Sequence, residues 1–235
     1  VYKRQAPFSA CTQLTEINVD EANPYFSSLD GVLTDKNRTT IVAYPAGKGK
    51  RYIIPDGITK IGTHSFFACY PITYIHMPNS VKTIELFAFA SCTDLDTVIL
   101  GNSVDSIEGA AFRINDRLKT IYSMNPIPPA AHPEAFSSFS PMFFIQCTLH
   151  VPVGSLQAYK NAEVWKNFKN IVENDFTGIE RPSPDKAKIF GNKNSIAFRN
   201  IEPGTDISIY DTTGKCIKTF AVDGDSEIPL PSGIY

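Results

Sequence analysis

IPDGITKIGTHSFFACYPITYIH, at residues 54–76, is followed directly by MPNSVKTIELFAFASCTDLDTVI at 77–99 and by LGNSVDSIEGAAFRINDRLKTIY at 100–122. Shifted by 23 residues, the three stretches keep apolar side chains at the same six positions. In the first stretch these positions are Ile54, Ile58, Ile61, Phe66, Ile72 and Ile75. Repetition at a fixed period of this length is typical of solenoids. The sequence therefore predicts a solenoid whose central coils are these three stretches.

One 23-residue unit is too short to enclose its own apolar side chains. Units must therefore stack, and each unit adds one layer to a shared core. We expect short parallel strands to join successive coils at about 4.8 Å, with Phe66, Phe89 and Phe112 in one interior column. Each fully buried side chain contributes roughly 1.5–3 kcal/mol of transfer free energy.

Less regular copies flank the three central ones. The Phe-x-x-Cys-x-x-Ile-x-x-Ile spacing recurs earlier in the chain at Phe8, Cys11, Leu14 and Ile17, where leucine replaces the first isoleucine. A later, stretched copy contains Phe136, and its strand is expected at 149–152. Before the central coils, β-rich runs at 31–34 and 40–44 enclose a polar turn. These runs predict a β-hairpin insertion near 24–45.

Residues 154–173 predict a helical cap, because the ends of a solenoid must be closed by atypical units. Ser155 is expected to cap the N-terminus of a helix. The apolar side chains that would cover the last coil are Leu156, Tyr159, Trp165 and Phe168. We interpret Trp165, the only tryptophan, as a capping residue; the alternative is a ring that stacks on a ligand.

The phase IPxxIxxIGxxxFxxCxxIxxI, which begins at Ile54, resembles the BspA-like leucine-rich repeat of surface proteins from Bacteroides and relatives. The leader at 23–33 resembles the hairpin insertion of that family, and residues 151–165 resemble its C-terminal cap. Departures are expected to loosen turn geometry: Gly62 becomes Glu85 and Glu108, Pro78 becomes Gly101, and Cys92 becomes Asn115. The resemblance implies a cell-surface or secreted protein that binds a protein partner, either a host matrix protein or a bacterial surface protein. It implies no catalysis.

We therefore predict a β-rich leucine-rich-repeat solenoid with 23-residue repeats, short parallel strands and a helical C-terminal cap, followed by a small antiparallel β-sandwich. The solenoid is expected over 6–173, a linker over 174–186 and the sandwich over 187–235. Residues 209–215 and 233–235 resemble the C-terminal sorting modules of secreted Bacteroidetes proteins. Because the sequence starts without Met and ends in what reads as a beginning strand, we interpret both ends as cut and the sandwich as truncated.

Cys11, Cys69 and Cys92 share one position of the repeat, and Asn115 takes that position in the next coil. A Cys or Asn side chain at a turn can hydrogen-bond the turn backbone. We therefore interpret the three cysteines as buried free thiols; the alternative is a disulfide between Cys69 and Cys92. The chain has no Cys-x-x-Cys pair, so a structural zinc site has little support.

Cys147 and His150 have the spacing of a thiol–imidazole pair. The repeat frame directs His150 out of its strand, however, and the sequence supplies neither an orienting third group nor an oxyanion hole. We predict that the protein is not an enzyme and uses no cofactor or metal. The formal net charge of −2 argues against a nucleic-acid partner. No run approaches the roughly 18–20 apolar residues of a transmembrane helix.

Strand alternation directs Ile75 and Met77 inward, and Tyr74 and His76 outward. Applied to every coil, this rule predicts one outward strip, the candidate binding surface: Ile53, Tyr74, His76, Ile99, Tyr122 and His150. Exposed aromatic and apolar side chains often mark recognition surfaces. The alternatives are that such residues are common on any sheet face, or that the insertion or the tail covers the strip.

Three functions follow from these observations. The favoured one is a surface adhesin or binding scaffold for a protein partner. The second is a carbohydrate-binding surface protein, in which Tyr74 and Tyr122 would stack on sugar rings. The third is a passive spacer that displays another domain.

Overall fold

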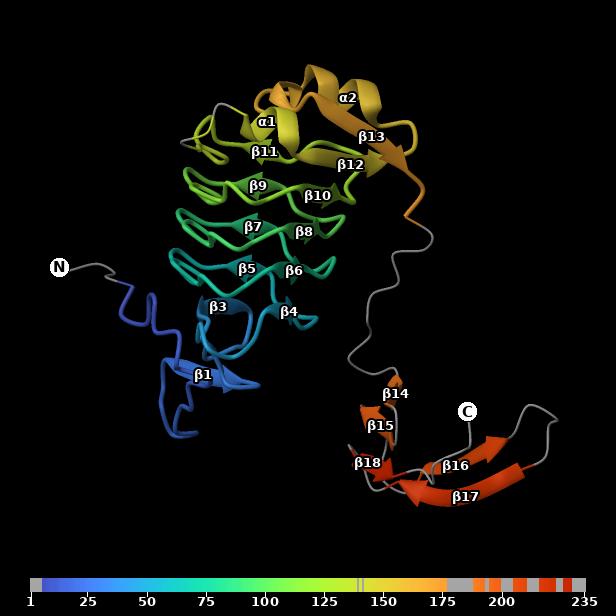
Figure 1. Cartoon of the computed structure of the whole chain (residues 1–235). Coiled ribbons are helices and arrows are strands. Elements are labelled where there is room, and N and C mark those ends of the chain that lie inside the picture. The colour runs from blue at the N-terminus through green and yellow to red at the C-terminus, as the bar shows by residue number, and fades with distance from the viewer. Residues whose placement is uncertain are drawn as a thin grey trace. The chain divides into compact units, whose positions relative to one another are not determined.

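Each central coil contributes two short strands, and the strands of successive coils form two separate sheets (Figure 1). The computed structural model describes residues 6–138, 140 and 142–176, and the backbone of five strands at 188–192, 195–199, 205–210, 216–222 and 226–229. The chain divides into two compact units, Val1–Gly178 and Ile179–Tyr235, and each is described by itself. No helix of the described residues is long and apolar enough to cross a membrane.

Sheet A has the strand order β1-β2-β3-β5-β7-β9-β11. Its strands are β1 (Phe26–Leu29), β2 (Val32–Asp35), β3 (Thr40–Ala43), β5 (Lys60–Ile61), β7 (Thr83–Ile84), β9 (Ser106–Ile107) and β11 (Ala130–Ala131). The first three pair antiparallel, which confirms the predicted hairpin and adds β1 to it. The others pair in parallel, with Ile61 beside Ile84 and Ile84 beside Ile107. The 23-residue step of the sequence is therefore the step from one rung of the sheet to the next.

Sheet B has the strand order β13-β12-β10-β8-β6-β4, and every pair in it is parallel. Its strands are β4 (Arg51–Ile53), β6 (Tyr74–His76), β8 (Thr97–Leu100), β10 (Thr120–Ser123), β12 (Thr148–Pro152) and β13 (Asn170–Asn174). The expected strand at 149–152 is β12. The predicted parallel pairing between coils is confirmed, whereas the division of each coil between two sheets was not foreseen.

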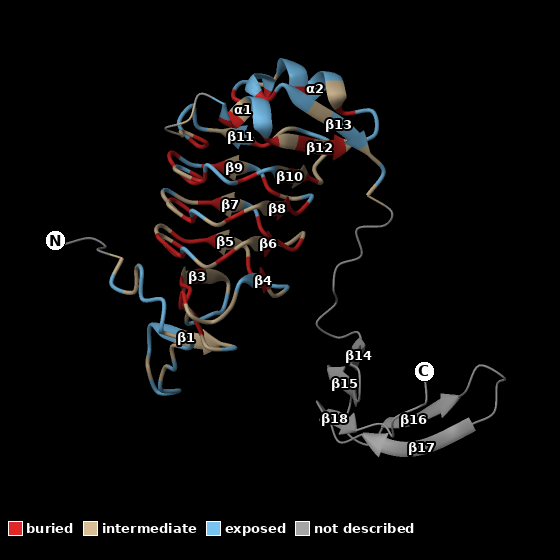
Figure 2. Cartoon of the chain, viewed as in Figure 1, coloured by how far each residue is buried: buried red, intermediate tan, exposed pale blue. Residues whose placement is uncertain are grey.

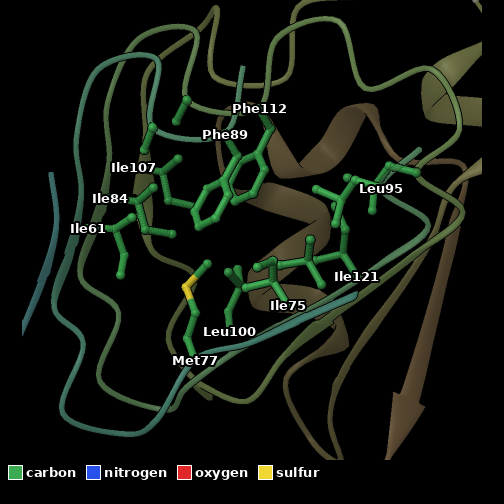
Figure 3. Close-up of a cluster of buried hydrophobic side chains, with 14 of the residues drawn as sticks. Ile61, Ile75, Met77, Ile84, Phe89, Leu95, Leu100, Ile107, Phe112 and Ile121 are labelled. Carbon is green, nitrogen blue, oxygen red and sulfur yellow. The ribbon is translucent and has the colours of Figure 1, made fainter. Parts of the chain in front are cut away.

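The core lies between the two sheets and is built in columns (Figures 2 and 3). Phe66, Phe89, Phe112 and Phe136 are buried and stack ring on ring, with centroids 4.7, 5.2 and 5.3 Å apart. Tyr44 continues the column beyond Phe66 at 4.8 Å. The predicted phenylalanine column is confirmed, and a tyrosine closes its N-terminal end.

The corners beside this column explain the shared cysteine position. The Cys92 thiol donates to the carbonyl oxygen of Phe66 at 3.1 Å, and the Asn115 amide donates to the carbonyl oxygen of Phe89 at 3.0 Å. Cys69 and Cys92 are free and buried, as predicted. Burial raises the pKa of the Cys69 thiol to about 12, so this thiol stays protonated at neutral pH. Cys11 is free but exposed, so the prediction of burial is wrong for the earliest copy.

The glutamates that replace Gly62 tie coils together instead of loosening the turns. The Glu85 carboxylate accepts hydrogen bonds from the Thr63 backbone N–H and hydroxyl at 2.9 and 2.8 Å. Glu108 accepts from the Leu86 N–H at 2.9 Å. Burial alone would raise the pKa of Glu85, but the Thr63 hydrogen bonds and Lys60 outweigh it and hold that pKa low. A carboxylate in this place supplies an acceptor to a corner N–H of the preceding coil.

The C-terminal end of the stack is closed by two short helices and a 3₁₀ turn. These are α1 (Phe143–Gln146), α2 (Leu156–Asn161) and η1 (Trp165–Asn167). Trp165 is fully buried against Phe136 at 5.6 Å, and its indole N–H donates to the Pro129 carbonyl at 2.7 Å. Its predicted capping role is confirmed.

Ser155 precedes α2, but its side chain makes no capping hydrogen bond, contrary to the prediction. The Glu173 carboxylate, from β13, instead accepts from the N–H groups of Gly154 and Leu156 at 2.8 and 3.2 Å. An unforeseen strand beside the helix thus supplies the acceptor for its first turn.

In the second unit, the described residues form five strands within 187–235, where the sequence predicts a β-sandwich: β14 (Lys188–Asn192), β15 (Ser195–Arg199), β16 (Thr205–Tyr210), β17 (Cys216–Val222) and β18 (Ser226–Pro229). Antiparallel pairing gives a three-stranded sheet, β14-β15-β18, and a separate pair, β16-β17. Most of the predicted linker and the turn residues of the sorting-like motif lie outside the described residues.

Candidate functional site

The predicted strip lies on the outward face of sheet B, in two rows. Register places Ile53, His76, Ile99, Tyr122 and His150 side by side in one row, which Val172 extends. Tyr74 belongs to the neighbouring row, between Arg51 and Thr97. The structure thus brings all six residues to one face, with Tyr74 beside the main row and not in it.

Exposure varies along the strip. Ile53, Tyr74, Tyr122 and His150 are half-buried. The side chains of His76 and Ile99 are only 2% and 4% exposed to solvent. The expectation that they face solvent is therefore wrong for these two. Each stands between two large side chains of its row, at the strand spacing of about 4.8 Å. Alternation fixes the direction of a side chain, but its neighbours decide how much of it solvent reaches.

Two ring contacts order the exposed part of the strip. The Arg51 guanidinium lies 3.8 Å from the centroid of the Tyr74 ring, a cation–π geometry. Tyr122 and His150 stack with centroids 4.6 Å apart and planes 19° apart. Arg51 and Tyr74 are direct partners in the β4–β6 register, so the step of 23 residues from Arg51 to Tyr74 could have revealed the first contact.

His150 is held in its neutral form by its surroundings. Burial lowers the pKa of the imidazole below its ordinary value of 6.5. Its Nδ1 atom is buried and has no hydrogen-bond partner among the described residues. A charged imidazole would therefore lose solvation at this position without gaining a partner.

Phe176 contacts the strip from beyond the last strand. The Asn174 side chain accepts a hydrogen bond from the Phe176 N–H at 3.0 Å, which turns the chain after β13. The Phe176 ring then meets the Tyr122 ring edge-on, with centroids 6.3 Å apart. The first residues after the solenoid thus contact one end of the strip, a contact that the local sequence pattern did not signal.

The Cys147 and His150 pair has no sign of nucleophilic chemistry. The Cys147 side chain is fully buried, and burial, with a further contribution from the Asp96 charge, raises the pKa of its thiol to about 12. His150 is stacked on Tyr122 on the outward face. Cys147 is thus a neutral core side chain at the start of β12.

The fold and the repeat agree with a known repeat family. Residues 45–150 match the family model described as BspA type Leucine rich repeat region, in six copies. This part of the chain is therefore similar to the class that the sequence resemblance suggested. A search among curated proteins finds no match.

Several solved structures are similar to this chain. The pneumococcal vaccine antigen PcpA is 18% identical, with a TM-score of 0.43, and the match covers 68% of this chain and 50% of that one. A leucine rich cell surface protein from Faecalibacterium prausnitzii is 19% identical, with a TM-score of 0.40, over 71% of this chain and 44% of the other. A leucine-rich repeat protein from Bacteroides capillosus is 20% identical, with a TM-score of 0.38, over 69% of this chain and 99% of the other. The chain spans half or less of the length of the first two proteins.

Proposed function

We propose that this chain is a non-catalytic protein, displayed on the cell surface or secreted, that binds a protein partner through the strip on sheet B. The observation that carries the proposal is the pair of ring contacts on the strip, Arg51 over Tyr74 and Tyr122 over His150. Tyrosine and arginine are enriched among the residues that dominate the energy of protein interfaces. The repeat backbone holds them in register, which lowers the entropy lost on binding.

The test is a pair of substitutions on the strip, Tyr74→Ser with Tyr122→Ser, in a binding screen. The unmodified chain and the variant are applied to arrays of matrix proteins, bacterial surface proteins and glycans. The expected result is a protein ligand that the unmodified chain binds and the variant loses. Tyr25→Ser is the matched control, because Tyr25 is 74% exposed and lies outside the strip.

The other outcomes separate the remaining functions. Loss of a glycan ligand alone would favour a carbohydrate-binding protein, and absence of any ligand for the unmodified chain would favour a spacer. A ligand that both variants retain equally would place binding elsewhere on the molecule. Equal unfolding midpoints for the variant and the control establish that lost binding is not lost folding.

For the tail, we propose a small β-sandwich that serves as a sorting module. Five strands in two antiparallel groups support this proposal. Deletion of 187–235 in the producing cell is expected to stop export of the solenoid, measured by surface labelling. Unchanged labelling would contradict the sorting role.

A further inference from the structure

After its sheet A strand, each coil turns at a corner, and the corners of successive coils stack one above another. One coil of this stack has no large side chains at its corner. The His64 and Phe87 rings, at equivalent corner positions, stack with centroids 5.1 Å apart and planes 17° apart. In the next coil, Gly109 and Ala110 stand where Leu86 and Phe87 stand one repeat earlier. The column of corner rings is therefore interrupted at Ala110. The face of the Phe87 ring that points away from His64 is directed toward the coil of Ala110, where no ring follows.

A hollow lies at this interruption, beside sheet A. Its lining includes Leu86 and Phe87 from one coil, Gly109 and Ala110 from the next, and His132 and Glu134 from the last. A Cβ atom at Gly109 would lie 3.4 Å from Leu86 Cδ1 and 3.3 Å from His132 Nδ1. The side chains of the coils on both sides thus reach the rung that Gly109 leaves open.

The hollow also carries acidic charge that the protein does not neutralise. Glu85 has a partner in Lys60 at 3.4 Å, but Thr83 occupies the position of Lys60 relative to Glu108. Glu134, which also lines the hollow, is exposed. Among the described residues, no ion pair joins either Glu108 or Glu134 to a basic side chain.

We propose that this hollow binds the guanidinium group of an arginine side chain from a protein partner. A guanidinium is planar, so it can occupy the missing rung with its face against the Phe87 ring. Its N–H groups diverge in the same plane and can donate to the Glu134 and Glu108 carboxylates. A lysine ammonium matches the charge but has no planar face to stack.

The test is an NMR titration of the full chain with two probes of equal charge, N-acetyl-arginine amide and N-acetyl-lysine amide. The arginine probe is expected to shift the amide signals of Gly109 and Ala110 in a saturable manner, and to bind at least several-fold more tightly than the lysine probe. Equal binding of the two probes, or no saturable shift at these signals, would overturn the proposal.

Two variants locate the site. Ala110→Phe restores the missing ring; the backbone permits it, since Phe87 already has a φ of 55° at the equivalent position, as Ala110 does. Arginine binding should disappear. Glu134→Gln keeps the shape, removes one charge-assisted hydrogen bond, and should weaken binding about tenfold. Glu163→Gln, which removes an exposed charge on the cap, is the control and should change nothing. Retained binding in both site variants would place the arginine elsewhere.

Discussion

The two sheets come from the same coils, yet their outward faces have opposite character. On sheet A the outward positions of successive coils are Lys60, Thr83, Ser106 and Ala130, which are short or hydrophilic apart from the lysine stem. On sheet B the equivalent row is Ile53, His76, Ile99, Tyr122 and His150. The inward positions of both sheets are alike, almost all branched aliphatic and buried.

This difference separates the repeat positions that core packing constrains from those that it does not. Each layer of the core has to match the layers above and below it, so Phe66, Phe89 and Phe112 recur at one position. Outward positions have no such constraint, because either sheet can form its ladder with any strand-compatible side chain. The bulky outward row of sheet B is therefore not demanded by stacking, which is why we assign it to binding.

The largest effect is expected in the interior. Phe89→Ala removes the middle ring of the column and should lower the free energy of unfolding by about 3–5 kcal/mol, because the neighbouring rings cannot collapse into the space. Thr83→Ala, an outward change on sheet A in the same coil, should stay within about 0.5 kcal/mol. Urea unfolding followed by circular dichroism measures both. Similar losses for the two variants would mean that the column is not what holds the coils together.

A smaller loss of stability is expected when the buried thiol of Cys92 is removed. Cys92→Ala removes the thiol donor at 3.1 Å from the Phe66 carbonyl, which keeps the Cys69 N–H as its other donor, so the loss should cost about 0.5–1.5 kcal/mol. Cys11→Ala changes the same repeat position in the exposed earliest copy and should cost almost nothing. Equal unfolding midpoints for the two variants would contradict a structural role for the buried thiol.

These two cysteines also show how far the repeat pattern predicts the fold. The spacing around Cys11 equals that around Cys69, and the corner forms in both, with Ala10 and Ala68 at the same φ of 56°. The pattern therefore predicts local conformation well. Burial is different, because it needs a neighbouring coil on each side, and a local spacing does not report whether the neighbour is there.

The candidate strip was predictable to the same degree. The period of the strands fixed which side chains point outward, and all six residues lie on one face. Two features came only from the structure: the burial of His76 and Ile99, and the approach of Phe176. Each depends on residues that are distant in the sequence or on the size of neighbours across the sheet.

A smaller effect is expected from His150 when the pH falls. The folded chain keeps this imidazole neutral with a lowered pKa, whereas the unfolded chain protonates it near 6.5. Below pH 6.5 the unfolded state binds more protons than the folded state. The stability that the neutral imidazole contributes above pH 6.5 is therefore lost progressively as the pH falls from 6.5 to the folded pKa. Unfolding midpoints measured from pH 7.5 downward should fall less for His150→Asn than for the unmodified chain. An identical fall in both would show that His150 does not titrate in this way.

The smallest effect is expected where the strip is partly covered. Phe176→Ala removes an edge-on ring contact with Tyr122 and should cost about 0.5–1 kcal/mol, because aromatic pairs of this kind contribute little beyond their buried area. The ring protons of Tyr122 should shift when the neighbouring ring current is lost, while those of Tyr74, held by Arg51, should not. If the partner binds over Tyr122, this variant should bind at least as well as the unmodified chain, since the partner no longer displaces Phe176. Weaker binding would instead make Phe176 part of the binding surface, and the strip would then extend beyond sheet B into the segment that follows it.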